Sequence, residues 1–165
     1  MDLKKIKMKN KKSMINIVLV EPEIPPNTGN IGRLCVGLDI SLFLVGKLGF
    51  SLKNKYLKRA GLDYWEHLKY YRYSSLKELQ KEFPDSTFYY FSKKAKKIYY
   101  EAIFKNGDFF VFGKETKGLP EQLLEKNKEN SLKIPMRGET RSLNLSNSVA
   151  IVAYEAFRQI NWEGK

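Results

Sequence analysis

The sequence predicts an α/β protein with a mostly parallel sheet and helices on both faces. Two observations lead to this fold class. Short apolar runs alternate with amphipathic stretches along the chain, which is the order expected for strands connected by helices. The first run, residues 15–20, is almost continuously apolar and rich in β-branched residues, as in a strand buried on both faces. With 165 residues and 42% hydrophobic content, the chain can build one ordinary domain.

The strands are predicted from apolar runs that turn-forming residues separate. We expect strands at residues 15–20, 41–45, 68–73, 87–91, 108–112 and 132–134. A Pro-rich turn follows the first strand, and a long basic loop with a helical turn occupies residues 46–63.

The helices are predicted from caps, prolines and periodicity. We expect helices at 27–38, 75–83 and 120–127, a short helix between the strands at 87–91 and 108–112, and a last helix from about 144. Ser75 and Glu78 have capping-box spacing, and Pro120 suits a first helical turn. The last helix carries an apolar stripe: Val149, Val152, Ala153, Ala156, Phe157 and Ile160.

The composition excludes several classes of function. Thirty Lys and Arg against 18 Asp and Glu give a net charge of +12, which indicates an anionic partner, with nucleic acid ahead of a membrane. No apolar run approaches the roughly 18 residues of a transmembrane helix and no signal peptide is evident, so we expect a soluble, cytoplasmic protein. The single cysteine, Cys35, and the single histidine, His67, cannot form a disulfide or a His/Cys zinc cluster, and we expect no metal.

The basic charge is concentrated in three places. Residues 1–13 hold six lysines and one aspartate, and we interpret them as a basic arm before a single domain at 14–165; a simple solubilising tail is the alternative. Two further clusters have tyrosines nearby and suit a nucleic-acid surface, although such runs are commonly only solvated faces. These clusters are Lys53, Lys55, Lys58 and Arg59, and Lys93, Lys94, Lys96 and Lys97.

Three loops rich in Gly, Asn or Arg follow predicted strands, where ligands of open α/β sheets bind. They span residues 25–33, 112–120 and 134–148. The chain has no G-x-G-x-x-G, no Walker-type loop and no G-x-S-x-G, so ordinary dinucleotide, P-loop and serine-hydrolase sites lack support. Cys35 lies on the apolar face of the first predicted helix and is interpreted as a core residue.

These loops resemble the motifs of the SPOUT superfamily of RNA methyltransferases. The likeness is to its small SpoU-type branch, which methylates tRNA at the wobble ribose. The matching segments are 17–35, 59–65, 112–120 and 141–150, in the order and spacing of that branch, so the resemblance covers about residues 14–162. Lys114 departs from the pattern, since many relatives have Pro between Gly113 and Glu115.

The resemblance implies a fold, a cofactor and a set of binding residues. It implies a deep trefoil knot in the C-terminal third and S-adenosylmethionine bound between knot loops, largely by backbone groups. The cofactor-binding residues that it implies are Tyr90 after the middle strand, Gly113, Ile134, Met136, Ser142 and Leu143. A glycine at 113 also suits close backbone approach.

The resemblance further implies the catalytic residues and the oligomer. Arg33 is assigned to the reacting hydroxyl, with anchoring of a phosphate as its alternative role because a guanidinium is a poor base. Asn27, Glu115, Ser142 and Asn144 complete the catalytic set, and Glu115 is a candidate partner for Arg33. A homodimer through the first and last helices is implied. Taken singly, Asn27 and Asn144 also fit helix caps, and Gly113 fits a turn.

The resulting functional hypothesis is a tRNA methyltransferase that uses S-adenosylmethionine to methylate the 2′-hydroxyl of wobble cytidine or uridine. Two alternatives stay open. One is 2′-O-methylation of another tRNA position or of ribosomal RNA. The other is a non-catalytic RNA-binding module on the same fold, which the charge of +12 alone would support.

Overall fold

The computed structural model describes residues 13–53 and 64–160, and these contain one parallel sheet of seven strands. The strands are β1 (Ile15–Val20), β2 (Ser41–Val45), β3 (Tyr70–Tyr73), β4 (Phe88–Phe91), β5 (Lys97–Ile98), β6 (Asp108–Phe112) and β7 (Ser131–Lys133). Their order across the sheet is β3-β2-β1-β6-β4-β7-β5, and every neighbouring pair is parallel. The predicted parallel α/β fold is confirmed.

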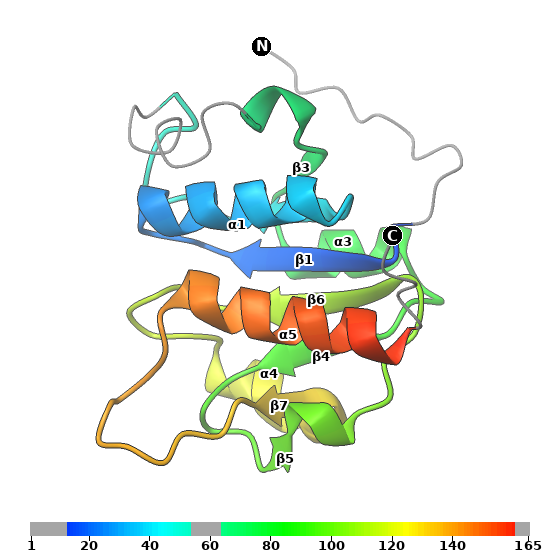
Figure 1. The fold of residues 1–165 in the computed structure, drawn as a ribbon, viewed down its shortest axis with the longest axis vertical. Helices are drawn as coiled ribbons and strands as arrows, with labels where there is room; N and C mark the ends of the chain where they lie inside the picture. The colour runs from blue at the N-terminus through cyan, green and yellow to red at the C-terminus, as the bar shows by residue number, and fades with distance from the viewer. Residues whose placement is uncertain (1–12, 54–63, 161–165) are drawn as a thin grey trace.

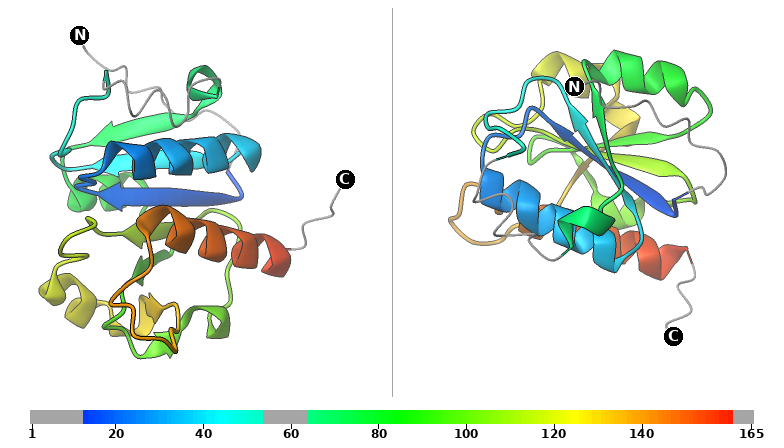
Figure 2. Two further views of the ribbon diagram at one scale, coloured as in Figure 1. Left: turned by 60° about the vertical axis from the view of Figure 1, so that its left-hand side comes forward. Right: turned by 90° about the horizontal axis from the view of Figure 1, so that it is seen from above.

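Helices cover both faces of the sheet (Figures 1 and 2). The helices are α1 (Pro25–Gly37), α3 (Leu76–Glu82), α4 (Glu121–Lys126) and α5 (Leu145–Gln159), with 3₁₀ turns η1 (Trp65–His67), η2 (Tyr99–Glu101) and η3 (Lys128–Asn130). Helices α1 and α5 lie side by side on one face, and α3 and α4 lie on the other. Within the described ranges, no helix has the length and apolar character that a membrane span requires.

Two hydrophobic cores form because alternate residues of the central strands point to opposite faces. Ile17 and Leu19 of β1 pack under α1 and α5, whereas Val18 packs on the side of α3 and α4. Cys35 is completely buried in the first core, as predicted, and this burial raises the pKa of its thiol. The second core combines aliphatic residues with buried aromatic ones, and Phe88 is stacked on Phe109 at 4.5 Å between ring centroids.

The parallel sheet brings the ends of four strands to one edge. Strands β1, β6, β4 and β7 are consecutive in the sheet, so the loops that follow them lie next to one another. These loops are residues 21–24, 113–120, 92–96 and 134–144. Two of the three loops singled out in the sequence belong to this group, whereas the third, residues 25–33, is not a loop but lies entirely within α1.

The structure corrects several predicted boundaries. Helix α1 begins at Pro25 rather than at 27, because proline fits the first helical positions, whose N–H groups have no partner within the helix. The short helix predicted between β4 and β6 is wrong: Lys97 and Ile98 pair with β7 as an edge strand, and only the 3₁₀ turn η2 follows. Strand β3 is shorter than predicted, since Leu68 closes η1. Strand β7 ends one residue earlier.

Some predictions fall outside the described residues. They concern the basic arm at 1–12, the helical turn in the basic loop and most of the first lysine cluster, which lies within 54–63.

The predicted N-cap of α3 is confirmed: Ser75 accepts a hydrogen bond from the Glu78 amide at 3.2 Å.

Candidate active site

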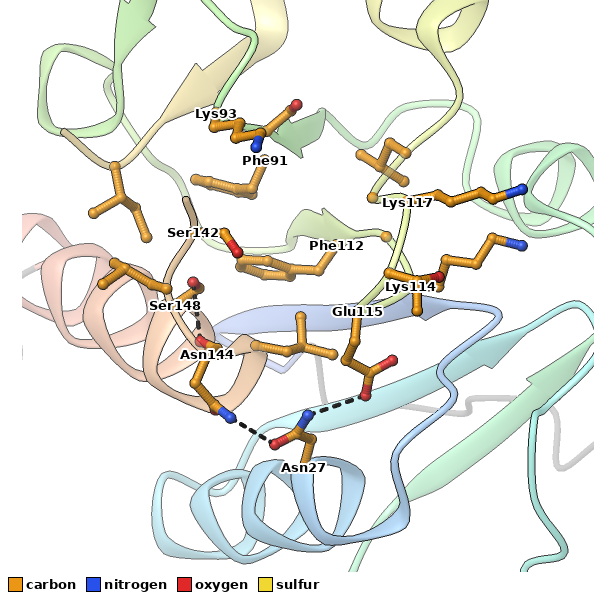
Figure 3. A pocket seen from close by; sticks show the side chains of 18 of the residues that line it. Asn27, Phe91, Lys93, Phe112, Lys114, Glu115, Lys117, Ser142, Asn144 and Ser148 are labelled. Carbon is orange, nitrogen blue, oxygen red and sulfur yellow. Dashed lines mark hydrogen bonds between the residues drawn. The ribbon is translucent and has the colours of Figure 1, made fainter. Parts of the chain in front are cut away.

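A cavity of about 420 Å³ lies at the carboxyl edge of the sheet (Figure 3). Its walls come from the loops after β4, β6 and β7 and from the first turns of α1 and α5. This volume is within the range typical of pockets for small ligands and cofactors. The lining residues are Ile24, Asn27, Phe91–Lys94, Phe112–Leu119, Ile134, Met136, Ser142–Leu145 and Ser148.

Two stacked aromatic rings form an apolar wall of the cavity. The rings of Phe91 and Phe112 lie 4.7 Å apart between centroids at an interplanar angle of 12°. Both residues end their strands, β4 and β6, which pair with Phe91 opposite Phe112. Ile134 and Leu143 add aliphatic surface to the lining. The cavity therefore combines an apolar wall, which suits a flat heterocycle, with polar groups from the loops.

The loop after β6 folds back on itself and needs glycine at position 113. A Cβ at Gly113 would lie 2.1 Å from the carbonyl carbon of Gly118 and 2.3 Å from the Leu119 nitrogen. The Gly118 amide donates to the Lys114 carbonyl at 2.8 Å, and Gly118 has a φ of +66°, which favours glycine. The close approach that glycine allows at 113 is thus to the loop's own backbone.

Glu115 connects the loop after β6 to the residues that begin α1. Its carboxylate accepts from the backbone amides of Glu23 at 2.8 Å and Ile24 at 3.1 Å, and from the Asn27 side chain at 3.1 Å. Helix α1 has no acidic residue in its first turn and no side-chain cap. Glu115 therefore supplies, from another loop, the negative charge that the positive end of a helix favours.

A chain of side-chain hydrogen bonds joins three segments that lie far apart in the sequence. Asn144 donates to Asn27 at 2.9 Å, and Asn27 donates to Glu115 (Figure 3). Asn144 is also the N-cap of α5, since its side-chain oxygen accepts from the Ser146 and Asn147 amides. Asn27 is buried within α1, so the alternative of Asn27 as a helix cap is wrong, whereas Asn144 is both a cap and a member of the site.

Two outer contacts strengthen the junction between the loops after β1 and β6. Lys114 forms an ion pair with Glu21 at 2.8 Å. Glu23 accepts from the Thr116 hydroxyl at 2.8 Å and from the Thr116 amide at 3.1 Å. The hydroxyl bond is the largest cause that lowers the pKa of Glu23, and the Thr116 amide and nearby lysines act in the same direction. Lys114, which forms the ion pair with Glu21, is the residue at which this sequence departs from the family pattern of Pro between Gly113 and Glu115.

Arg33 lies outside the cavity, in a separate groove between α1 and α5. Asn30, Arg33 and Tyr154 line this groove together with Ser146 and Asn147. The first turn of α5 separates the two hollows: Asn144, Leu145 and Ser148 line the cavity, whereas Ser146 and Asn147 line the groove. The guanidinium carbon of Arg33 lies 5.1 Å from the centroid of the Tyr64 ring. The suggested pairing of Arg33 with Glu115 is not formed: no ion pair within the described residues includes either side chain.

The structure brings most of the predicted site residues to one cavity. Eight of them line it: Asn27, Gly113, Glu115, Ile134, Met136, Ser142, Leu143 and Asn144. Arg33 does not, and neither does Tyr90. Tyr90 was expected after the middle strand, but it lies inside β4 with its ring buried in the second core and its hydroxyl bonded to Gln80. Its pKa is raised by this burial.

Sequence reasoning did not assign the end of β4 and the residues after it to this cavity, and it placed Lys93 and Lys94 only on a candidate nucleic-acid surface. Phe91 and Ser92 line the cavity, and so do Lys93 and Lys94. The Lys93 ammonium group donates to the Arg141 carbonyl at 3.2 Å, which links this loop to the loop after β7. The sequence could have indicated these residues. The other cavity loops begin where a strand ends, and the same position at the end of β4 is Phe91 and the residues after it.

The fold and the cavity define the class as an α/β protein with a ligand site at the carboxyl edge of a parallel sheet. The chain belongs to the SpoU rRNA Methylase family, whose model matches residues 14–154. That match contains all of the described strands and the first two thirds of α5, and it spans both hollows.

Named relatives are similar along nearly the whole chain. A protein from Listeria monocytogenes is 53% identical over 150 residues, which are 89% of each chain. A protein from Burkholderia cenocepacia, named tRNA (cytidine(34)-2′-O)-methyltransferase, is 45% identical over 154 residues, covering 92% of this chain and 99% of its own. A solved structure described as giving insights into 2-OH methylation of C/U34 on tRNA has a TM-score of 0.84 and 42% identity, covering 90% of this chain and 97% of its own.

More distant structures share the fold. AviRb from Streptomyces viridochromogenes, a SpoU methyltransferase solved in complex with AdoMet, has a TM-score of 0.79 at 21% identity and covers 92% of this chain and 60% of its own. At this identity the similarity concerns the arrangement of strands and helices.

Proposed function

We propose that this protein is an S-adenosylmethionine-dependent tRNA 2′-O-methyltransferase that acts on the wobble nucleotide, cytidine or uridine 34. The observation that carries the proposal is the similarity to the Burkholderia cenocepacia tRNA (cytidine(34)-2′-O)-methyltransferase, which is 45% identical and extends over 92% of the chain. The cavity supports it, because the residues that the family resemblance assigned to the cofactor and the reaction mostly line one space.

The cavity fits S-adenosylmethionine in size and lining. A volume of about 420 Å³ and a wall of stacked phenylalanines suit an adenine ring, and the polar loops suit a ribose and an amino acid. Gly113, Ile134, Ser142 and Leu143 would hold it. When bound, the cofactor supplies an electrophilic methyl group on a sulfonium.

The described residues supply positioning more than acid–base chemistry. The Glu115 carboxylate accepts three hydrogen bonds, and it therefore serves to hold Glu23, Ile24 and Asn27 in place. Asn27 and Asn144 in turn fix the start of α5 against α1. Rigid placement of two reactants, with water excluded by the apolar wall, can account for much of the acceleration of a methyl transfer.

A homodimer formed through α1 and α5 belongs to the same proposal. Arg33 lies outside the cavity of its own chain, and Ile151 and Tyr154 are large exposed side chains on α5. An isologous α1–α5 interface would place Arg33 of one chain at the cavity of the other chain. There Arg33 orients the ribose hydroxyl or anchors the adjacent phosphate. Sedimentation at micromolar concentration tests it: a dimer is expected, and a fully active monomer would contradict it.

The remaining parts of the proposal concern the chain as a whole. Residues 14–165 form one domain preceded by a basic arm, the protein is cytoplasmic, and the C-terminal third carries the knot expected of the superfamily. The knot stays a prediction from the family resemblance.

Transfer of a labelled methyl group tests the function. The protein is incubated with labelled S-adenosylmethionine and either total tRNA or ribosomal RNA, and the 2′-O-methyl position is mapped. Methylation of nucleotide 34 is expected. Methylation confined to ribosomal RNA would contradict the wobble assignment and leave the chemistry intact.

A non-catalytic RNA-binding module is the second candidate, which the net charge of +12 favours. Calorimetric titration with S-adenosylmethionine separates the two, since a module that only binds RNA has no reason to bind the cofactor.

A further inference from the structure

Tyr64 is the aromatic neighbour of the arginine that the proposed function assigns to the RNA. Its ring centroid lies 5.1 Å from the guanidinium carbon of Arg33, within the range of a cation–π contact. Arg33 is exposed, and among the described residues no carboxylate is close enough to form an ion pair with it. The Tyr64 ring is therefore the contact, among the described residues, that restricts where the guanidinium points.

The position of Tyr64 is set by packing elsewhere. Tyr64 immediately precedes η1, which lies on α1. A Cβ at Gly32 would lie 3.0 Å from Cζ3 of Trp65 and 3.1 Å from Cδ2 of Leu68, so η1 packs tightly on α1 at this glycine, and a larger residue would require those side chains to shift. Trp65 and Leu68 belong to or pack on the first core. Gly32 and Arg33 are adjacent, so the contact that places η1 also places the Tyr64 ring beside Arg33.

We propose that Tyr64 is a positioning residue that holds the Arg33 guanidinium in the orientation needed at the reacting ribose or its phosphate. The inference rests on the proposed function, in which Arg33 acts on RNA. An arginine side chain loses considerable rotamer entropy when it is fixed, so a ring that pre-orients it reduces the cost of ordering it in the transition state. Tyr64 itself acts only through Arg33.

Substitution of the ring tests the inference through turnover. Tyr64→Leu should lower kcat for tRNA methylation by roughly three- to thirtyfold, since cation–π contacts gain strength when RNA covers them and excludes water. Tyr64→Phe should keep most of the wild-type kcat, because it keeps the ring and removes only the hydroxyl. The affinity for S-adenosylmethionine, measured by calorimetry, should be unchanged in both variants, because Tyr64 does not line the cavity.

Tyr73→Leu is the matched control. Tyr73 is half-buried, lines neither the cavity nor the groove, and has its ring beside Phe43 rather than an arginine. It should keep wild-type kcat. Equal losses of kcat in Tyr73→Leu and Tyr64→Leu would overturn the inference, as would unchanged turnover of Tyr64→Leu or a kcat of Tyr64→Phe as low as that of Tyr64→Leu.

A double-mutant cycle separates an action through Arg33 from an independent one. In an Arg33→Ala background, Tyr64→Leu should cause no further loss of single-turnover rate. The same fold-loss in both backgrounds would overturn the inference, because Tyr64 would then act on RNA or on folding directly. The wild-type protein is assayed in parallel, and its failure to methylate any RNA would instead refute the proposed function, and this inference with it.

Discussion

The cavity and the Arg33 groove lie on two sides of the first turn of α5, yet they are built in different ways. The cavity is held by a continuous set of hydrogen bonds through Glu115, Asn27 and Asn144. The groove has exposed side chains, and Arg33 contacts only an aromatic ring among the interactions described above. The difference indicates that the cavity is organised before its ligand binds, whereas the groove is completed by another molecule.

The largest expected effect is on turnover and comes from the groove. Arg33→Ala should lower the rate of methyl transfer by roughly 100- to 1,000-fold, as for loss of one preorganised donor at a reacting centre. The affinity for S-adenosylmethionine should stay nearly intact, because Arg33 does not line the cavity. Single-turnover kinetics and calorimetry measure the two quantities.

Arg33→Lys is the companion variant. It keeps the charge without the planar fork, so it should rescue little. Wild-type turnover of Arg33→Ala at saturating tRNA would contradict the role of Arg33 and direct attention to Arg137 and Arg141.

The second effect should fall on the cavity and on cofactor affinity. Gly113→Ala places a methyl group 2.1 Å from the Gly118 carbonyl carbon, so the loop must move. We expect the affinity for S-adenosylmethionine to fall by an order of magnitude or more, and the free energy of unfolding to fall by about 1–3 kcal/mol. Calorimetry and urea denaturation measure these quantities. Gly138→Ala, where a Cβ meets nothing within 4 Å, is the control and should behave as wild type.

A smaller effect on stability should follow from breaking the hydrogen-bond chain. Asn27→Ala leaves Glu115 without one donor and Asn144 without its acceptor, at a cost of about 1–3 kcal/mol in the free energy of unfolding. Urea denaturation measures it. Asn30→Ala, at an exposed position one turn along α1, should change stability far less; equal losses would mean that the chain adds little to the rigidity of the cavity.

The smallest effect concerns the outer contact of Glu23 with Thr116. Because the pKa of Glu23 is lowered in the folded protein, its contribution to stability is present above the unfolded value of 4.5 and is lost as the pH falls through the lowered value. Thr116→Val removes the hydroxyl bond, so the pKa of Glu23 should rise toward 4.5 in a carboxyl NMR titration. Thr116→Ser keeps the hydroxyl and should keep the lowered pKa; a Thr116→Val titration identical to wild type would refute this assignment.

Sequence reasoning succeeded where local pattern is decisive. The buried apolar runs gave β1, β2 and β6 with their correct bounds, and the loop motifs gave most of the cavity lining. It failed at the edge of the sheet, where β5 has only two residues and exists because β7 lies beside it. It also assigned Tyr90 to the cofactor, although Tyr90 lies within the predicted strand 87–91. Alternate residues of a strand face opposite sides of the sheet, so Tyr90 lies in the second core and the cavity lining begins at Phe91.

The sequence by itself determined the parallel α/β class, the family and the set of polar residues at the carboxyl edge. Only the tertiary structure decided how those residues are used. Asn27 and Glu115 are 88 positions apart, and Asn27 and Asn144 are 117 apart, so their hydrogen bonds depend on the order of strands in the sheet. The same holds for Arg33, which lies in the groove between α1 and α5 rather than beside Glu115, and which contacts Tyr64 because η1 packs on α1 at Gly32.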